Sequence, residues 1–140
     1  MTKERLRRYV EIKKEARQIR DKIEEIESRL YSPKGQLLTG MPSAPSHEGG
    51  TITESLIDRH AQLIQMYQAH LVRLDEEQLA IETAIASLTD PTARRLMRYR
   101  YLDGLKWEEI CVLINYEWSR THEIHGMALK LLKEQEKPEA

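Results

Sequence analysis

The sequence predicts an all-α protein in which a long N-terminal helical hairpin or coiled coil precedes a helix-turn-helix. Three observations predict it: two long stretches carry apolar residues spaced alternately three and four apart, a Pro/Gly-rich segment separates them, and the last third holds three shorter helical patterns with clear start and stop signals. Hydrophobic residues make up 40% and charged residues 32%, with no Phe. A lean core of Leu and Ile suits bundled helices better than a sheet.

The first stretch predicts one amphipathic coiled-coil helix over residues 1–30. Its apolar positions alternate by three and four residues, the spacing of a heptad seam. They are Tyr9, Ile12, Ala16, Ile19, Ile23, Ile26 and Leu30. The residues between are mostly charged or amide side chains, which tolerate a helix and keep its other faces in water.

Residues 31–52 predict a flexible linker, because they hold three prolines and four glycines. Its length allows the chain to return on itself or to reach a partner chain. Residues 53–89 predict the second coiled-coil helix, with Thr53 as a plausible N-cap. Its seam is Ile57, His60, Ile64, Tyr67, Leu71, Leu74, Gln78, Ile81, Ile85 and Leu88.

Each long helix has a single apolar stripe, so neither is expected to be stable alone in water. Residues 1–30 carry ten Lys/Arg against seven Asp/Glu, and residues 51–90 carry two against seven. These opposite balances favour pairing of the first helix with the second. Pairing between copies stays open, and a homodimer or higher homo-oligomer is expected. The polar seam residues His60 and Gln78 are expected near the ends of the contact or as register markers.

Residues 90–135 predict the helix-turn-helix domain, and residues 136–140 a disordered tail. Asp90 is the expected N-cap and Pro91 the first helical residue, while Gly104 ends that helix. The expected buried residues of the first helix are Ala93, Leu96, Met97 and Tyr101. Those of the second are Trp107, Ile110, Cys111, Leu113 and Ile114.

A turn at residues 115–117 precedes the third helix, whose expected buried stripe is Thr121, Ile124, Ala128, Leu131 and Leu132. Trp118, Ser119, Arg120, His122 and His125 are expected outside it. Gly126 in mid-helix would cost about 1 kcal/mol relative to Ala, and close packing there could offset it.

Two short helices joined by a short turn are the architecture that presents a recognition helix to the major groove of DNA. The first turn of such a helix offers free N–H groups to phosphates and side chains to bases. The candidate DNA-binding residues are therefore Trp118, Ser119, Arg120, His122 and Glu123, with Lys106, Arg94, Arg95 and Arg98, together with Arg100, as backbone contacts.

Residues 91–133 resemble region 4 of bacterial sigma factors, most clearly in the run RYRYLDGLKWEEICVLINYEWSRTHEIHGMALKLL. The matching positions are Arg98, Tyr101, Gly104, Trp107, Glu108, Glu109, Ile110, Ile124, Ala128, Leu129 and Leu132. The wider layout resembles small phage and prophage regulators of Gram-positive bacteria, the RinA- and ArpU-like late-gene regulator group. This resemblance implies a sigma-region-4-like regulator, without the other sigma regions that starting transcription alone would need.

The sequence therefore predicts a sequence-specific DNA-binding transcriptional regulator of phage or prophage origin that dimerises through its N-terminal helices. The alternative is an adaptor that binds RNA polymerase or another regulator without reading DNA. An enzyme is not expected, because no Gly-rich phosphate loop, nucleophile elbow or convergent carboxylate pair is found.

No cofactor and no metal are expected, since His122, His125 and Cys111 fall short of four zinc ligands. A single cysteine and the lack of a signal peptide or membrane span favour the cytoplasm of a bacterial host cell.

Overall fold

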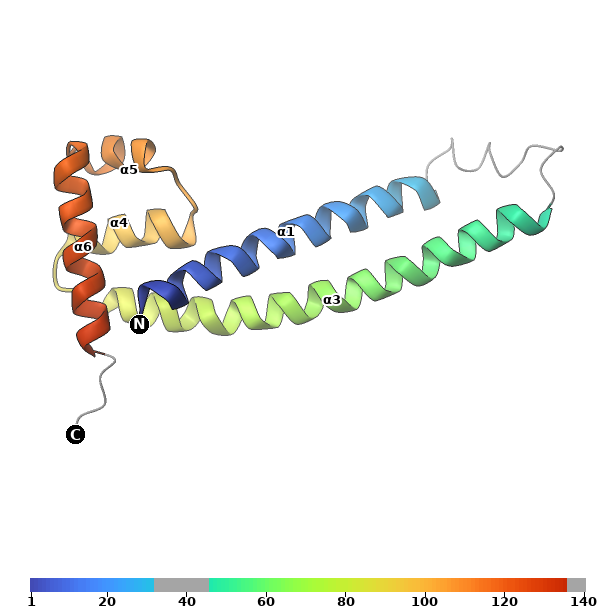
Figure 1. The fold of residues 1–140 in the computed structure, drawn as a ribbon, viewed down its shortest axis with the longest axis horizontal. Coiled ribbons are helices and arrows are strands. Elements are labelled where there is room, and N and C mark those ends of the chain that lie inside the picture. Colours follow the sequence, from blue (N-terminus) through green and yellow to red (C-terminus); the bar gives the residue numbers. More distant parts are fainter. Residues whose placement is uncertain (32–45, 136–140) are drawn as a thin grey trace. The chain divides into compact units, whose positions relative to one another are not determined.

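The computed structural model describes residues 1–31 and 46–135, and all regular structure in these two ranges is helical. The prediction of an all-α protein is confirmed. The elements are α1 (Lys3–Tyr31), α3 (Ser46–Ala86), α4 (Pro91–Met97), the π-helix η1 (Arg98–Leu102), α5 (Trp107–Ile114) and α6 (Trp118–Gln135) (Figure 1). None of the described helices combines the length and apolar content that a membrane crossing requires.

The chain divides into two compact units, and both long helices contribute to each. Unit 1 contains Met1–Lys13 and the chain from Arg73 onward, and unit 2 is Lys14–Val72. The shorter helices α4, η1, α5 and α6 therefore belong to unit 1 together with the first turns of α1.

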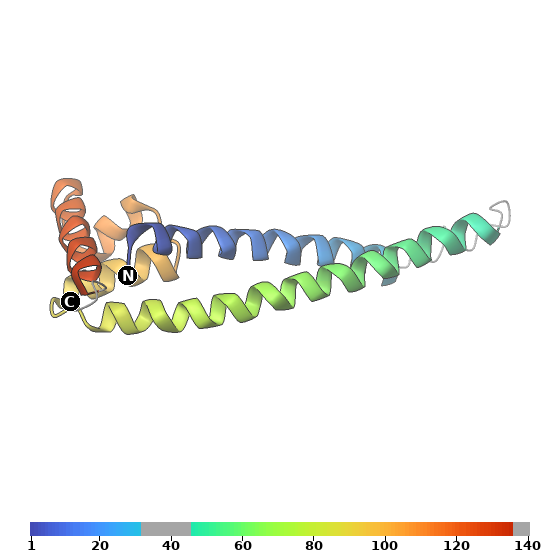
Figure 2. The same ribbon diagram turned by 60° about the horizontal axis from the view of Figure 1, so that its bottom comes forward.

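In unit 2, α1 and α3 of the same chain pair in antiparallel directions (Figures 1 and 2). Glu27 lies 3.0 Å from the His60 ring nitrogen, and Glu15 lies 3.5 Å from His70. The intrachain pairing that the charge balance favours is confirmed here, although these two polar contacts join acidic residues of α1 to histidine rings of α3. His60 therefore serves the register of the helix pair.

The second long helix begins at Ser46, seven residues before the predicted start at Thr53, and ends at Ala86 rather than at residue 89. The predicted linker was thus wrong for residues 46–52, where the backbone is helical through Gly49 and Gly50. A glycine destabilises a helix by about 1 kcal/mol. This cost does not prevent a long helix from continuing, because extending an existing helix costs much less free energy than forming its first turn. Residues 32–45, the rest of the predicted linker, and the predicted tail 136–140 lie outside the described residues.

The contact line of α3 departs from the predicted heptad seam in one of its two rows. Ile81, Ile85 and Leu88 are buried as predicted, but Ile57 and Leu71 are 52% and 43% exposed, and Gln78 is exposed as well. The less exposed positions are one residue earlier, at Leu56, His70 and Glu77. The predicted seam residues His60, Tyr67 and Leu74 stay partly buried, so the contact line still repeats every seven residues, with one of its two rows one residue earlier than predicted.

The core of unit 1 joins the two ends of the chain. Leu6 and Tyr9 of α1 are 0% and 2% exposed and belong to the same apolar cluster as the buried residues of the shorter helices. Those residues are Ala93, Leu96, Met97, Tyr101, Ile110, Ile114, Ile124, Ala128 and Leu132. The predicted domain boundary at residue 90 therefore does not mark an independent core.

The start of α1 is capped and tied to α6. The Thr2 hydroxyl accepts a hydrogen bond from the Arg5 N–H at 3.2 Å, which satisfies one of the free donors of the first turn. The terminal ammonium of Met1 donates to the carbonyl of Leu132 at 3.1 Å. These bonds fix the first turns of α1 within unit 1.

The junction of α3 and α4 is built from complementary caps. Asp90 accepts a hydrogen bond from the Thr92 N–H at 3.1 Å and Pro91 opens α4, as predicted. The Arg94 guanidinium donates to the carbonyls of Leu88 and Thr89 at 2.7 and 3.1 Å. These are the carbonyls that follow α3, whose last turn contains no basic residue of its own.

The predicted single helix from Pro91 to Gly104 changes to a π-helix at Arg98. The Asp103 N–H bonds the Arg98 carbonyl across five residues at 3.0 Å, and the Leu105 N–H bonds the Tyr99 carbonyl at 2.9 Å. Gly104 ends this segment with φ +70, the left-handed conformation expected of a helix-stopping glycine.

The turn between α5 and α6 is a Schellman-type stop. Asn115 has φ 61, its N–H bonds the Val112 carbonyl at 3.3 Å, and the Tyr116 N–H bonds the Cys111 carbonyl at 3.2 Å. The predicted turn at residues 115–117 is confirmed, and α6 packs against both α4 and α5 (Figure 2).

Three details of the predicted packing were wrong. Leu113 and Leu131 are each 46% exposed, because each lies at the outer border of its helix's apolar stripe. Gly126 does not serve close packing, since a Cβ atom built there would meet nothing within 4 Å.

The two glycines of unit 1 make a matched pair for a stability test. Both have open space around them, but only Gly104 has a positive φ. We expect Gly126→Ala to raise the free energy of unfolding by about 1 kcal/mol, because alanine restricts the unfolded chain and favours the helix. Gly104→Ala should lower it by about 1–2 kcal/mol, because a Cβ strains the left-handed conformation. Urea unfolding of both variants measures this, and equal effects of the two substitutions would contradict the assignment.

Candidate functional site

The first turn of α6 projects from unit 1 as the sequence predicts. Trp118 is 54% exposed, and Ser119 and Arg120 are exposed as well. Behind them Thr121 is fully buried and its N–H bonds the Glu117 carbonyl at 2.9 Å, which marks the first helical hydrogen bond. The turn is therefore exposed on one side and held by the core on the other.

Arg120 and Glu123, both predicted site residues, lie side by side on the exposed face of α6. The guanidinium of Arg120 is 3.2 Å from the carboxylate of Glu123, one helical turn on. The two side chains are 48% and 61% exposed, so an ion pair of this kind contributes only about 0–1 kcal/mol. Little free energy is therefore lost when Arg120 leaves the Glu123 carboxylate and binds another anion.

His122 does not project into solvent as predicted. Its ring lies between two indoles, with centroid distances of 4.4 Å to Trp107 and 4.5 Å to Trp118. Its Nε2 atom is buried and has no hydrogen-bond partner in the part of the chain that the structure describes. His122 thus fixes the orientation of Trp118 relative to α5 and is not available as a base-reading side chain.

His125, predicted outside the buried stripe, is 7% exposed. Its Nε2 lies 2.7 Å from the Tyr101 hydroxyl, and its ring meets the edge of Trp107 at 4.7 Å. Burial, together with the nearby cations Lys3, Arg100 and Arg7 and with His122, lowers the pKa of His125 to about 4. Burial also raises the pKa of Tyr101, so at neutral pH both rings are uncharged and the tyrosine hydroxyl donates to the imidazole.

Three of the predicted backbone-contact arginines are engaged inside the protein. Arg94 caps the carbonyls that follow α3, and Arg95 donates to the Leu113 carbonyl at 3.1 Å while lying over the Tyr99 ring. Arg100 donates to the Leu105 carbonyl at 3.1 Å, and its guanidinium is 4.6 Å from the centre of the Trp107 ring. These three cations stabilise turns and aromatic contacts.

The other two predicted cations keep their charges available. Arg98 and Lys106 are both exposed, and neither forms a hydrogen bond or ion pair through its side chain within residues 1–31 and 46–135. Lys106 stands at the N-cap position of α5, where its backbone is extended. The structure therefore separates the predicted set into cations with a structural role and cations that remain free.

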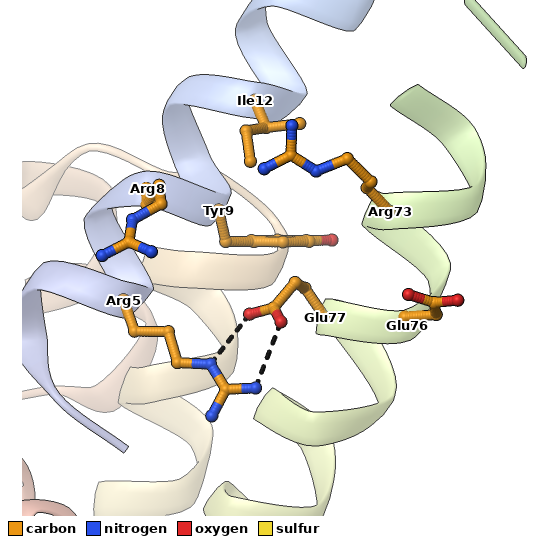
Figure 3. Close-up of a pocket in the computed structure, with 7 residues that line it drawn as sticks. All are labelled: Arg5, Arg8, Tyr9, Ile12, Arg73, Glu76 and Glu77. Carbon is orange, nitrogen blue, oxygen red and sulfur yellow. Dashed lines mark hydrogen bonds and ion pairs between the residues drawn. The ribbon is translucent and has the colours of Figure 1, made fainter. Parts of the chain in front are cut away.

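A cavity of about 120 Å³ lies between α1 and α3 in unit 1 and is lined by seven residues (Figure 3). The guanidinium of Arg5 makes two hydrogen bonds to the Glu77 carboxylate, at 2.9 and 3.1 Å, below the ring of Tyr9. The hydrogen bond from Arg5 lowers the pKa of Glu77. In this pair a basic residue of α1 meets an acidic residue of α3, which matches the predicted charge complementarity.

Among the described residues, no group of three or more His, Cys, Asp and Glu side chains is arranged to hold a metal ion. Cys111 is a partly exposed free thiol. His122 and His125, three residues apart on α6, are engaged with aromatic side chains instead.

The sequence reasoning missed the aromatic cluster formed by Tyr101, Trp107, Trp118, His122 and His125. Its signal was present in the spacing, since Trp118 and His122 are four apart and His122 and His125 three apart, which places them on adjoining rows of one helix.

The chain matches no protein-family model, no curated protein and no solved structure.

The Tyr101–His125 pair predicts a specific pH dependence of stability. The folded-state pKa of His125 is about 4 and the unfolded-state value is near 6.5, so the unfolded chain takes up a proton first as the pH falls. The contribution of the neutral His125 to the free energy of unfolding is therefore fully present above pH 6.5. It is lost between pH 6.5 and 4, by about 1.4 kcal/mol per pH unit at most.

Urea unfolding at pH 7 and pH 4.5 measures the effect, with His125→Gln as the comparison because glutamine cannot titrate. We expect the native protein to lose more stability over this range than the variant. Equal losses would contradict the assignment.

Tyr101→Phe leaves a buried imidazole nitrogen unpaired. This substitution should lower the free energy of unfolding by about 1–3 kcal/mol at pH 7.

Proposed function

We propose that this protein binds double-stranded DNA through α5, the Asn115 turn and the N-terminal turn of α6, and that it acts as a transcriptional regulator. The observation that carries the proposal is the exposed first turn of α6, with Trp118, Ser119 and Arg120 at the surface. The resemblance of residues 91–133 to sigma region 4 favours the same reading.

Rigidity of the reading turn supports the proposal. Residues Ile124, Ala128 and Leu132 bury the opposite face of α6, and the hydrogen-bonded Asn115 turn fixes its approach to α5. A side chain held in this way loses little conformational entropy when it contacts a base edge. Trp118 is held in addition by its contact with His122.

The chemistry of the turn suits a major groove. The guanidinium of Arg120 can pair bidentately with guanine after leaving Glu123, and the Ser119 hydroxyl can bind a phosphate or a base. Arg98 and Lys106, both exposed and uncommitted, supply phosphate contacts. Glu123 discourages wrong partners by presenting a negative charge beside Arg120.

The modest positive charge of this surface implies that one copy binds DNA weakly. A homodimer would double the contacts and place two half-sites about a two-fold axis. The exposed apolar side chains of α3 in unit 2, Ile57, Met66, Leu71 and Val72, favour such an assembly, since exposed apolar side chains of this size on a helix are typical of protein contacts.

Selection of binding sites from random duplex DNA with the purified protein tests the proposal. We expect enrichment of a sequence motif, and a loss of about 5- to 150-fold in affinity for that motif in Arg120→Ala, the range of one bidentate base contact. Arg29→Ala is the matched control, because Arg29 forms a similar exposed pair with Glu25 on α1. No enriched motif, or equal losses in both variants, would refute sequence-specific reading.

A second candidate function is that of an adaptor that binds RNA polymerase or another regulator without reading DNA. Exposed apolar residues on α5 and its turn favour it: Val112 is 79% exposed, and Tyr116, one turn on, is 43% exposed. If this function holds, purified bacterial RNA polymerase should bind the protein and Val112→Lys should abolish the complex, while Leu79→Lys at an exposed position of α3 should not. A protein that binds DNA normally and does not bind polymerase would refute the adaptor.

A further inference from the structure

The first turns of α1 carry exposed cations whose side chains form no hydrogen bond or ion pair in the described part of the chain. Lys3 and Arg7 are both exposed, and neither forms a hydrogen bond or ion pair through its side chain within residues 1–31 and 46–135. They are four residues apart, so they lie on one face of α1 about 6 Å apart along the helix axis.

The position of these cations within unit 1 is defined by buried contacts. Leu6, between them in sequence, is fully buried in the core that also contains Ile124 and Leu132 of α6. The Met1 ammonium bonds the Leu132 carbonyl, which ties the helix start to α6. Lys3 and Arg7 are thus presented by the same rigid unit that presents the reading turn.

The surroundings of the two side chains are positively charged. Lys3, Arg7 and Arg100 all act on the buried His125, and Arg7 and Arg100 act on Tyr101, each by lowering the pKa of its ring as a cation does. The charged residues that act on these two rings are all cationic. In a chain with a net charge of −1, this is a local concentration of cations around the two rings.

We propose that Lys3 and Arg7 of α1 form a second nucleic-acid contact surface, which binds phosphates of the DNA backbone beside the duplex read by α6. The inference rests on the proposed DNA binding and adds a helix that the sequence assigns only to the coiled coil. Phosphates are the fitting partner because they repeat along each strand about every 3.4 Å of duplex, so two long cationic side chains about 6 Å apart can each reach a phosphate of the same strand.

The extent of the surface is limited by acidic side chains on the same helix. Glu4 follows Lys3 directly, and Glu11 lies one turn beyond Arg7, so the positive face covers only the first two turns of α1. Such a surface contributes affinity without sequence information, since phosphate contacts carry none directly.

The experiment compares the salt dependence of DNA binding for three full-length proteins. The native chain, Lys3→Gln/Arg7→Gln and the control Arg17→Gln/Arg20→Gln are titrated with a duplex between 50 and 200 mM salt. The control removes two exposed cations from the part of α1 in unit 2. Circular dichroism melting checks that each variant is folded, because none of the four side chains is buried.

We expect the slope of log K against log salt to become less negative by about 1.8 in Lys3→Gln/Arg7→Gln, because two phosphate contacts are lost. The preferred DNA sequence should be unchanged. The control should keep the native slope. A native slope in Lys3→Gln/Arg7→Gln overturns this inference and leaves the proposed function intact, as does an equal reduction in both double variants. Absence of DNA binding by the native chain at 50 mM salt overturns both. A third outcome is that Lys3 and Arg7 are needed for binding of poly-glutamate and not for binding of DNA. This outcome would identify an acidic protein as the partner of the surface and would also overturn the inference.

Discussion

The structure of unit 1 depends on the insertion of the N-terminal helix into the core formed by the C-terminal helices. Leu6 and Tyr9 complete the apolar cluster around Leu96, Tyr101 and Leu132, and the Met1 ammonium closes the contact on α6. A core of α4, α5 and α6 alone would be small, and small cores bury too little apolar surface to be stable. The chain therefore builds its C-terminal unit from both of its ends, and cations on α1 are held close to α6.

Charge in this unit is divided between structural and available groups. Arg94, Arg95 and Arg100 donate to main-chain carbonyls at helix ends and turns, where unsatisfied acceptors would be costly. Cations that satisfy carbonyls in this way keep their charge but lose the freedom to approach a ligand. The remaining cations of this unit are spread over several elements, so the proposed DNA contact relies on several weak contacts and on a second copy rather than on one basic helix.

Aromatic contacts determine how α6 is presented. Trp118, His122, Trp107 and His125 follow one another in ring contact, and Tyr101 joins the cluster through its hydrogen bond to His125. Both histidines lie at positions that periodicity alone leaves outside the apolar stripe of α6. The neutral imidazole of His125 can be buried because its nitrogen has a partner and its ring meets aromatic rings, and this partner, Tyr101, comes from η1, which the local spacing on α6 does not reveal.

The sequence by itself determined the helical class, the caps at Asp90 and Pro91, the stops at Gly104 and Asn115, and most buried positions of the shorter helices, because these follow from local backbone preferences and from short-range periodicity. Only the tertiary structure decided that Leu6 belongs to the C-terminal core, that the contact line of α3 passes through Leu56 rather than Ile57, and that Arg94 is a cap while Arg98 is free. The reason is that the neighbours Leu56 and Ile57 are both apolar, so the pattern leaves two adjacent rows open and only the packing against α1 selects between them. A cation's availability, likewise, depends on which carbonyls the fold brings within its reach.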